Sequence, residues 1–343
     1  MTHYNNTSLN TMPDGEEVQF VVLKNANGMQ VEVMSYGATV TAIKVPIEDQ
    51  SIVDVVLGFE NAAAYINSFN LPSPPYFGTI VGRYAGRINE SKFDLNDKTI
   101  HLNPNHGKHV LHGGEEGFSK KNWKVVNINQ GTNPSVTLTY TSPANEENFP
   151  GELTVEVTYT LTESNELKVE YNATTTEDTI VNLTHHSYFN LDGHQHAVSQ
   201  QELFVNANKV LEKNDQNIPT GRMLPVAGTP FDFLSSKKCP IAIDDTFVLS
   251  SSEEVAASLY SAKNNLQLLV YTNQPGVHIY VGGNCFDTIS GKEGANYHSL
   301  SGICFETQNF PDAPNHNHFP SAVLKKGENY YHKTIYKFQS KSI

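Results

Sequence analysis

Two short stretches of the chain carry the residues best suited to proton transfer. Residues 182–191 read NLTHHSYFNL and place adjacent histidines, a serine and a tyrosine in an otherwise apolar segment. Residues 302–312 read GICFETQNFPD and carry a lone carboxylate, Glu306, in similarly apolar company. An imidazole gives and takes protons near neutral pH, and a carboxylate is a common partner in acid–base catalysis. We therefore interpret His186 and Glu306 as an acid and a base that meet across a pocket.

The elements that would position this pair are strands. Alternation of apolar and polar residues is strongest at 153–161 (LTVEVTYTL), and a tight connection leads into a second alternating run at 167–171. Further strands are predicted at 18–23, 29–34, 39–45, 52–57, 136–140, 266–271, 278–281, 303–306 and 335–338, with two short strands between 88 and 100. The best helical candidate is the short segment 251–257.

Strands with one apolar face and one face of Thr and Glu need a second sheet to cover them. The sequence therefore predicts an all-β fold, a large antiparallel β-sandwich with very little helix. No linker, low-complexity tract or internal repeat divides the chain. We expect one domain over residues 1–343, with residues 1–15 as a loose N-terminal segment.

The overall charge argues against two classes of partner. The net charge is −13, whereas binding to nucleic acid or to an anionic membrane needs clustered Lys and Arg. No apolar run approaches the ~18 residues of a membrane span, and residues 1–20 lack the pattern of a secretory signal. Cys239, Cys285 and Cys304 are widely spaced without a CxxC pair, which indicates reduced thiols. We expect a cytoplasmic monomer or homodimer that binds neither nucleic acid nor membrane.

Three loops contain further candidate groups. Residues 71–77 (LPSPPYF) hold three prolines, which exclude regular structure, and form either a loop over the pocket or a spacer. Residues 78–89 place glycines around Arg83 and Arg87. An arginine beside glycine can approach a ligand closely, or it can hold a loop through bonds to carbonyls. Residues 106–118 (HGKHVLHGGEEGF) lack a helical or strand period, and long ordered loops of this kind often carry function.

Six motifs in a fixed order resemble the aldose 1-epimerase, or galactose mutarotase, family. They are GRYAGRI from residue 82, VLHGG from 110, NLTHHSYFNL from 182, DDTFVL from 244, NQPGVHIY from 273 and FETQNFPD from 305. The LHGG and ETQNFPD strings are specific, and the resemblance runs from about residue 15 to the C-terminus. It implies a β-supersandwich fold and the interconversion of α and β anomers of a free monosaccharide such as galactose or glucose. It also implies that no cofactor is needed.

The resemblance assigns roles to individual residues. Glu306 matches the family's general base and His186 its general acid. The implied sugar-binding residues are Gly86, Arg87, His112 and Asp244, with Tyr188 and His278 as further pocket members. Two positions depart from the family pattern, because Asp245 follows Asp244 where relatives commonly have histidine, and His278 stands where some relatives have glutamine. The resemblance does not rank the aromatic residues Phe77, Phe118, Tyr188 and Phe310 as partners for the apolar sugar face.

Three alternatives compete with this interpretation. A metal site is suggested by the pairs His194–His196 and His316–His318, but both lie in loops rich in Asn, Gly and Pro, so we expect no metal. A hexose-6-phosphate 1-epimerase of the same fold would need several cations near the pocket, and the sequence offers only Arg83, Arg87 and Lys108. A non-catalytic carbohydrate-binding β-sandwich would not need a matched acid and base.

Overall fold

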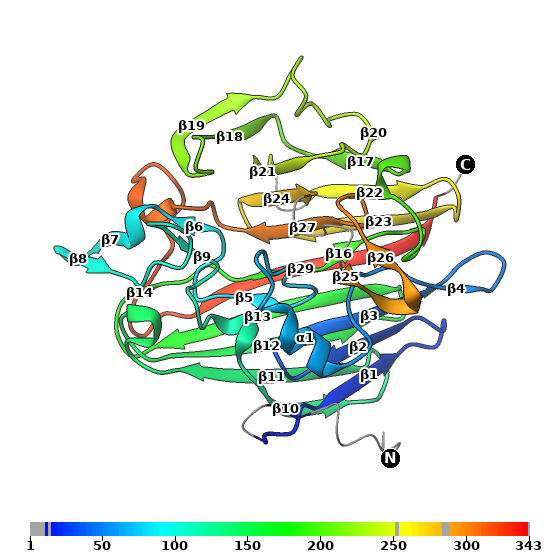
Figure 1. Ribbon diagram of the computed structural model, residues 1–343, viewed down its shortest axis with the longest axis horizontal. Helices are drawn as coiled ribbons and strands as arrows, with labels where there is room; N and C mark the ends of the chain where they lie inside the picture. Colours follow the sequence, from blue (N-terminus) through cyan, green and yellow to red (C-terminus); the bar gives the residue numbers. More distant parts are fainter. Residues whose placement is uncertain (1–10, 13–14, 251–253, 283–288, 342–343) are drawn as a thin grey trace.

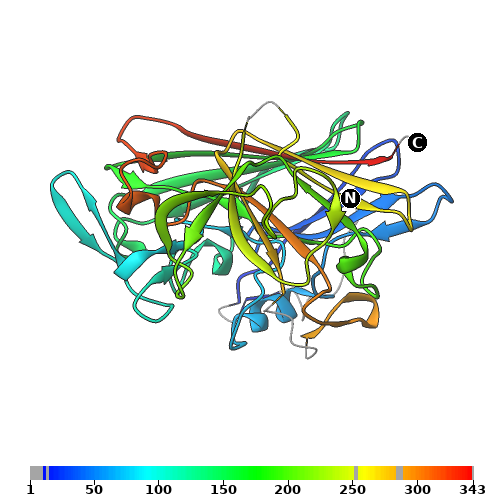
Figure 2. The ribbon, with the colours of Figure 1, turned by 90° about the horizontal axis from the view of Figure 1, so that it is seen from above.

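The computed structural model describes residues 11–12, 15–250, 254–282 and 289–341, in which two layers of antiparallel strands face each other (Figures 1 and 2). One layer is a nine-stranded sheet. In order across the sheet its strands are β10 (Lys124–Asn129), β11 (Ser135–Ser142), β12 (Leu153–Leu161), β13 (Glu166–Thr175), β29 (Tyr330–Ser340), β23 (Leu266–Thr272), β22 (Ala257–Ser261), β17 (Glu202–Val205) and β20 (Lys237–Lys238). The C-terminal strand β29 lies between β13 and β23 and joins the two parts of this sheet.

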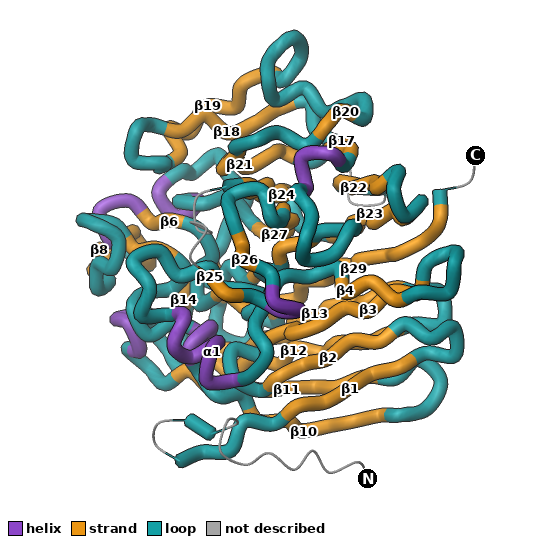
Figure 3. Tube along the Cα trace, turned by 45° about the vertical axis from the view of Figure 1, so that its right-hand side comes forward, coloured by secondary structure: helices purple, strands orange, loops and turns teal. Residues whose placement is uncertain are grey.

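The facing layer contains two further sheets. The six-stranded sheet has the order β16 (Tyr188–Phe189), β27 (Ile303–Gln308), β24 (Gly276–Val281), β21 (Ile243–Val248), β18 (Lys209–Lys213) and β19 (Pro219–Pro225). The four-stranded sheet has the order β1 (Phe20–Lys24), β2 (Gln30–Met34), β3 (Thr39–Pro46) and β4 (Ile52–Asp54). Figure 3 shows β1 to β3 running beside β10 to β12 of the large sheet, and β1 contacts both β11 and β12.

Short two-stranded ladders complete the scaffold. They pair β5 (Ile80–Val81) with β15 (Thr184–His185), β6 (Arg87–Ile88) with β9 (Val110–Leu111), β7 (Lys92–Leu95) with β8 (Lys98–His101), β14 (Thr179–Ile180) with β28 (Val323–Leu324), and β25 (Ile289–Ser290) with β26 (Asn296–Tyr297). One α-helix, α1 (Ala62–Ser68), lies among the described residues. None of the described helices has the length and apolar character needed to cross a membrane.

A continuous hydrophobic core fills the space between the layers. In β12 the side chains of Val155 and Val157 are fully buried, whereas Glu156 between them is exposed. The apolar cluster that contains these two valines also includes Val31 of the four-stranded sheet and Ile279 of the six-stranded sheet. Because one core unites all three sheets, it supports the interpretation of the chain as a single domain.

The predicted all-β antiparallel fold with little helix is confirmed. Strand 153–161 coincides with β12, whereas the runs at 136–140 and 335–338 are parts of the longer strands β11 and β29. The run predicted at 52–57 is shorter in the structure, because β4 ends at Asp54. The Val55 N–H still donates to the Ile43 carbonyl of β3, and residues 55–57 then bond to the 188–190 segment, with the Leu57 N–H donating to the Tyr188 carbonyl.

The helix prediction at 251–257 is wrong at its described end, because Ala257 begins strand β22. Residues 251–253 lie outside the described residues, as does most of the predicted loose segment 1–15. The helix that forms, α1, was not predicted. The Asn61 side chain caps its first turn by accepting a hydrogen bond from the Ala64 N–H at 3.0 Å, and the alanines that follow Asn61 favour helix.

A buried ion pair fastens the β25–β26 hairpin to the four-stranded sheet. Lys292, between these two strands, is 7% exposed, and its Nζ lies 2.6 Å from Asp54 Oδ2 and 2.6 Å from the Thr41 carbonyl oxygen. Burial alone would raise the pKa of Asp54, but the charge of Lys292 and the His194 ring, whose Nε2 lies 3.6 Å from Oδ2, outweigh burial and lower it. The carboxylate is therefore kept ionised in the core by its partners.

We expect Lys292→Met to lower the free energy of unfolding by ~3 kcal/mol, because it leaves the Asp54 charge buried without its partner. Urea unfolding at pH 7 measures this change. The double variant Lys292→Met/Asp54→Asn should recover much of the loss, and Lys92→Met, at an exposed ion pair, should leave the unfolding midpoint unchanged. Equal stability of the Lys292 variant and the parent protein would contradict the role given to this pair.

Candidate active site

The candidate site is built on one face of the six-stranded sheet, where neighbouring strands place polar residues side by side. Successive residues of a strand point to opposite faces, so Cys304, Glu306 and Gln308 of β27 share one face. In the ladder, Glu306 lies opposite His278 of β24, and His278 lies opposite Thr246 of β21. The register of three strands thus creates a polar row.

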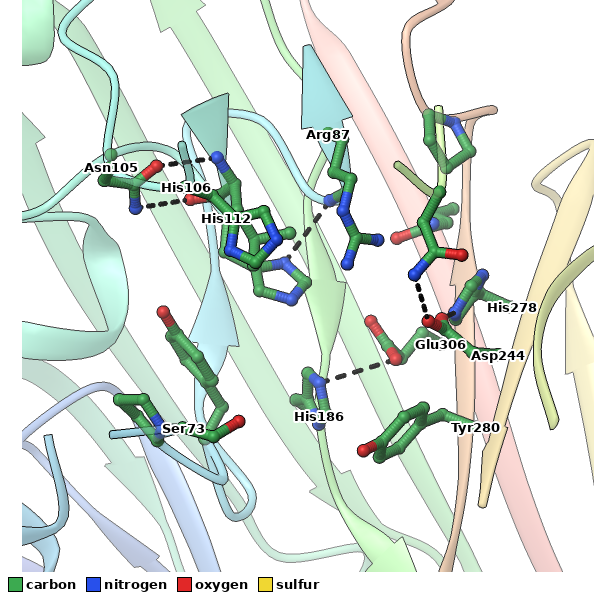
Figure 4. A pocket seen from close by; sticks show the side chains of 18 of the residues that line it. Ser73, Arg87, Asn105, His106, His112, His186, Asp244, His278, Tyr280 and Glu306 are labelled. Carbon is green, nitrogen blue, oxygen red and sulfur yellow. Dashed lines mark hydrogen bonds and ion pairs between the residues drawn. The ribbon is translucent and has the colours of Figure 1, made fainter. Parts of the chain in front are cut away.

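His186 reaches the same face from the segment before β16. Tyr188 of β16 pairs with Cys304, and continuing this antiparallel register by two residues brings His186 across from Glu306. Two backbone hydrogen bonds to residues 78–79, each of 3.0 Å, anchor His186. Its Nε2 lies 3.4 Å from Glu306 Oε1, and both side chains are almost completely buried (Figure 4).

This contact differs from the expected arrangement in one respect. We expected the acid and the base to face each other across the pocket, and the structure places them next to each other on one wall. The pairing of β16 with β27 is the physical reason, because it leaves no gap between the two side chains. A ligand would therefore have to present two adjacent polar atoms to the pair.

The short β6–β9 ladder carries Arg87 and His112 to the pocket. Arg87 lies opposite Leu111, the residue before His112. The Gly86 N–H donates to His112 Nδ1 at 3.3 Å, which leaves the proton of the neutral ring on Nε2. Burial, followed by the charges of His186 and Arg87, lowers the pKa of His112 well below its ordinary value. The His112 ring is therefore a neutral hydrogen-bond donor at physiological pH.

Asp244 and His278 form an ion pair on neighbouring strands. His278 Nε2 donates to Asp244 Oδ1 at 2.8 Å, and His278 Nδ1 lies 2.8 Å from the Thr246 hydroxyl. Burial alone would lower the pKa of His278, but the hydrogen bond and charge of Asp244 outweigh it and raise the pKa. Burial alone would raise the pKa of Asp244, but the hydrogen bond and charge of His278, together with the charges of Arg87 and Lys213, outweigh burial and bring the pKa to about 2. Asp244 therefore stays ionised and oriented.

These groups surround a cavity of about 440 Å³. Seven of the eight predicted site residues line it, namely Gly86, Arg87, His112, His186, Asp244, His278 and Glu306. Figure 4 shows the side chains of Arg87, His112, His186 and Glu306 directed toward a common space. The cavity size falls in the range of small-molecule sites, and its polar lining suits a ligand with many hydroxyl groups.

Tyr188 is the predicted residue that the structure does not bring to the cavity surface. Its side chain is 1% exposed, and its ring lies behind His186 with 5.3 Å between the ring centroids. Tyr280 of β24 lines the cavity instead, next to Tyr188. Tyr188 can therefore act on a ligand only through the residues in front of it.

The proline-rich loop at 71–77 forms part of the wall, which supports its interpretation as a loop over the pocket. Leu71, Pro72, Ser73, Pro74 and Tyr76 line the cavity. The Tyr76 ring lies near-parallel to that of His186, with 5.9 Å between centroids. The four aromatic residues left unranked by the sequence, Phe77, Phe118, Tyr188 and Phe310, are absent from the lining, where Phe69, Tyr76 and Tyr280 stand.

Arg83 and Arg87 separate into a structural and a pocket arginine. Arg83 is 2% exposed, and its guanidinium donates to the Ser142 hydroxyl and to carbonyl oxygens of Ser142, Pro143, Pro150 and Gly151. It therefore holds the 142–151 loop. Arg87 lines the cavity, and its buried Nε has no hydrogen-bond partner among the described residues. This uncommitted donor is consistent with a group kept for a ligand.

Two residues beside predicted site positions face away from the pocket. Asp245 follows Asp244 on β21 and is absent from the cavity lining, and its carboxylate pairs with the Nζ of Lys213 at 3.1 Å. His185 is 2% exposed and contacts the ring of Tyr336, and burial lowers its pKa to about 3. Because side chains alternate along a strand, Asp244 and His186 face the cavity and their neighbours Asp245 and His185 do not. The sequence alone did not settle these two choices.

Several lining residues were missed from the sequence. Gln308 and Tyr280 stand two positions from Glu306 and His278, so strand alternation could have found them. Asn105 was not signalled by any pattern. Its side chain exchanges hydrogen bonds of 3.0 and 2.7 Å with the backbone of Leu111, which holds the end of β9.

One group of side chains has the composition of a metal site. Candidate ligand atoms of His112, His186 and Glu306 lie within 4.8 Å of one another. Two imidazoles and a carboxylate are a donor set that zinc can use. The histidine pairs suggested by the sequence, at 194 and 196 and at 316 and 318, are absent from the cavity lining. A metal at the three-residue group would occupy the atoms that an acid–base pair needs, so the two uses exclude each other.

The chain is similar to characterised proteins over most of its length. Residues 19–337 match a family model described as aldose 1-epimerase. A galactose mutarotase from Bos taurus is 40% identical over 325 residues, which cover 90% of this chain and 91% of that protein. An aldose 1-epimerase from Escherichia coli K12 is 34% identical over 343 residues, which cover 95% of this chain and 96% of that protein.

Two solved structures have the same fold. An aldose epimerase homologue from C. elegans superposes with a TM-score of 0.88 at 28% identity, covering 95% of this chain and 100% of the other. A galactose 1-epimerase from Lactobacillus acidophilus gives a TM-score of 0.84 at 27% identity, covering 96% and 97%.

The His278–Asp244 pair predicts a pH-dependent contribution to stability. The pKa of His278 is raised in the folded protein above its ordinary value of 6.5. Its contribution to stability is therefore fully present below pH 6.5 and is lost as the pH rises through the folded-state pKa. We therefore expect the stability advantage of the parent protein over His278→Gln to be largest near pH 6 and to shrink at higher pH. Urea unfolding of both proteins across this range measures it.

The contribution of Asp244 does not disturb this window, because it is lost only as the pH falls toward about 2. A stability difference between the two proteins that stays constant from acidic to alkaline pH would show that His278 is not the titrating group.

Proposed function

Because the chain belongs to the aldose 1-epimerase family, we propose that it interconverts the α and β anomers of free aldoses such as galactose and glucose. The observation that carries the proposal is the contact between His186 Nε2 and Glu306 Oε1 at 3.4 Å, in the wall of a polar cavity. Opening and reclosing a sugar ring is proton transfer without redox chemistry, so an acid and a base suffice.

The adjacency of the two groups fits the chemistry of the anomeric carbon. In the closed ring, C1 carries both the hydroxyl oxygen and the ring oxygen, so the two atoms that exchange protons are neighbours. Glu306 takes the proton of the C1 hydroxyl while His186 gives a proton to the ring oxygen, and the C1 to ring-oxygen bond breaks to form the aldehyde. Rotation about the C1–C2 bond and reversal of both proton transfers close the ring on the other face. Each positioned group contributes typically ~10² to 10⁴-fold.

The remaining cavity residues are suited to orient the sugar. His112 presents a neutral N–H, and the planar guanidinium of Arg87 can donate to adjacent hydroxyls. Asp244, held by His278, is a fixed acceptor on the strand side of the cavity. Tyr76 and Tyr280 also line the cavity, and aromatic rings are suited to pack against the apolar face of a sugar.

The charges around the cavity favour a free sugar over a sugar phosphate. Of the cations that line it, Lys120 lies 2.9 Å from Glu115 and Lys213 lies 3.1 Å from Asp245. Of the two other cations considered from the sequence, Arg83 is bound to a loop and Lys108 pairs with Glu90. Arg87 is thus left without the cluster of cations that a phosphate group requires.

The thiols support the further proposal of a cytoplasmic location. Cys239 and Cys304 are both buried and neither forms a disulfide, as expected of a reducing compartment. Cys285 lies outside the described residues. The oligomeric state, expected to be monomer or homodimer, stays a prediction.

We expect Glu306→Gln and His186→Asn each to lower the mutarotation rate by ~10²-fold or more, because each removes one partner of the proton exchange. Polarimetry of freshly dissolved α-galactose measures the rate. The controls are Glu156→Gln and His101→Asn, which change exposed residues of the same types far from the cavity lining. Rates near that of the parent protein in either site variant would remove that residue from catalysis. Retained sugar binding with no catalysis in the parent protein would favour the carbohydrate-binding alternative.

A panel of aldoses tests the substrate class. We expect galactose and glucose to be turned over, and glucose 6-phosphate to be turned over at least ~10-fold more slowly, because its phosphate meets Arg87 without a supporting cluster of cations. Polarimetry at equal sugar concentration is the measurement. Faster conversion of the phosphate ester would make the sugar-phosphate epimerase the better assignment.

A further inference from the structure

The turn between β18 and β19 places one further polar side chain at the cavity. Asn217 lies in this turn, is half-buried and lines the cavity together with Asp244. Its Nδ2 donates to Asp244 Oδ2 at 3.2 Å. None of the six sequence motifs includes Asn217, and the proton transfers proposed for His186 and Glu306 do not involve it. The Asn217 side chain therefore has a place at the site but no role in the reaction.

The turn itself does not need this side chain. The side-chain oxygen of Asn214 accepts hydrogen bonds from the backbone N–H groups of Gln216 and Ile218, at 2.9 and 3.1 Å, and these bonds close the turn. The backbone of Asn217 is left-handed, with a φ of +58°, which asparagine tolerates and glycine adopts freely. The backbone thus explains why a residue with this conformational freedom is present. It does not explain an amide that reaches Asp244.

Contacts on either side of Asn217 hold the turn in place. Gln216 Oε1 lies 3.2 Å from the Nε2 of His109, in the loop that precedes β9. Lys213, at the end of β18, places its Nζ 3.1 Å from Asp245 Oδ1. The amide of Asn217 is therefore positioned before a ligand arrives, which reduces the entropy lost on binding.

The pair formed by Asn217 and Asp244 keeps hydrogen-bonding capacity for a ligand. A carboxylate offers about four acceptor sites, and among the described residues only His278 and Asn217 donate to the carboxylate of Asp244. An amide has a pair of N–H donors and an acceptor oxygen. Within the described ranges, the second N–H and the oxygen of the Asn217 amide have no hydrogen-bond partner. A hydroxyl group both donates and accepts, so it can bind the carboxylate and the amide at once.

The order of the strands indicates which part of the sugar reaches this pair. In the proposed reaction His186 acts on the ring oxygen and Glu306 on the C1 hydroxyl, so the step from ring oxygen to C1 runs from the β16 side of the sheet to β27. Further across the sheet lie β24, β21 and β18, and further round the ring in the same sense lie C2 and C3. Neighbouring strands are ~4.8 Å apart, so β27 and β21 are separated by roughly 10 Å, a gap that one sugar ring can bridge through hydrogen bonds at both sides.

The groups on β24 and β21 distinguish C3 from C2. His278 stands on β24, between the strands of Glu306 and Asp244, and its two ring nitrogens face Thr246 and Asp244. The C2 hydroxyl therefore meets an imidazole that is already satisfied. The C3 hydroxyl meets a carboxylate and an amide that are not.

We propose that Asn217 is a specificity-determining residue that binds the C3 hydroxyl of the sugar together with Asp244. The hydroxyl donates its proton to the carboxylate and accepts a hydrogen bond from the second N–H of the amide. The inference rests on the proposed function, because the proposed proton transfers orient the sugar in the cavity.

A panel of sugars that lack single hydroxyl groups tests the contact. Exchange NMR between the two anomers at equilibrium gives kcat and KM for each sugar. Asn217→Gly removes the amide and keeps the left-handed backbone. We expect it to raise KM for glucose and for 6-deoxygalactose about fivefold, the effect of losing one hydrogen bond. The kcat values should stay within about twofold, because the C3 hydroxyl is remote from the bond that breaks and is bound equally throughout the reaction. For 3-deoxyglucose the parent protein and the variant should have the same KM.

Two further variants isolate the amide. Asn217→Asp keeps the size and backbone of the residue, removes both N–H donors and sets a second carboxylate beside Asp244, so it should raise KM for glucose at least as much as the glycine variant. Asn96→Gly is the matched control. Asn96 also has a left-handed backbone and donates to a carboxylate, that of Asp178, at 3.0 Å, but it is exposed and absent from the cavity lining. Its KM values should equal those of the parent protein.

The outcomes separate this contact from the fold and from the proposed function. A KM for glucose in Asn217→Gly equal to that of the parent protein would overturn the proposal, as would an equal rise in KM for glucose and 3-deoxyglucose. If the parent protein binds sugars without exchanging their anomers, the proposed function fails, and dissociation constants from NMR titration of the same sugars decide the role of Asn217. Should the glycine variant not fold, Asn217→Asp carries the same comparison between glucose and 3-deoxyglucose.

Discussion

The pairing of β16 with β27 is the constraint on which the candidate site depends. It sets Tyr188 opposite Cys304 and thereby brings His186 into contact with Glu306. Because side chains alternate along a strand, a slip of one residue in either strand would turn Glu306 into the core and remove the contact. The large sheet and the hydrophobic core matter to the site mainly because they fix this register. A one-residue slip would expose an apolar face of the strand that must stay buried.

The charged groups differ in how fully neighbouring groups satisfy them. Lys292 with Asp54 and Lys213 with Asp245 are committed to each other, and Arg83 is committed to backbone carbonyls. The cavity is lined by groups with looser ties, such as Arg87 and the neutral ring of His112. Buried charges are costly without partners. Because most of the charged groups have partners, a few donors and acceptors in the cavity can stay available to a ligand.

Much of this arrangement was accessible from the sequence, for identifiable reasons. The period-two pattern of LTVEVTYTL predicted β12 to the residue, and the acid–base chemistry of His186 and Glu306, together with the family motifs, located the site. The position of Tyr188 behind His186, and the choice between Arg83 and Arg87, depend on which side of a loop or strand faces the cavity. No local pattern encodes that choice. Tyr76 was missed because its packing against His186 joins two segments more than one hundred residues apart in the sequence.

The central place of β29 has a consequence for how the chain is made. This strand follows β13 and β23 in the sequence yet lies between them in the sheet, so both of those strands keep an open edge until residues 330–340 have been synthesised. Unpaired edges of long apolar strands invite association with other chains, and pairings between distant segments form slowly. During synthesis the chain therefore passes through a state in which β13 and β23 are both made but the main sheet cannot close, a state in which chaperones would have the most to offer.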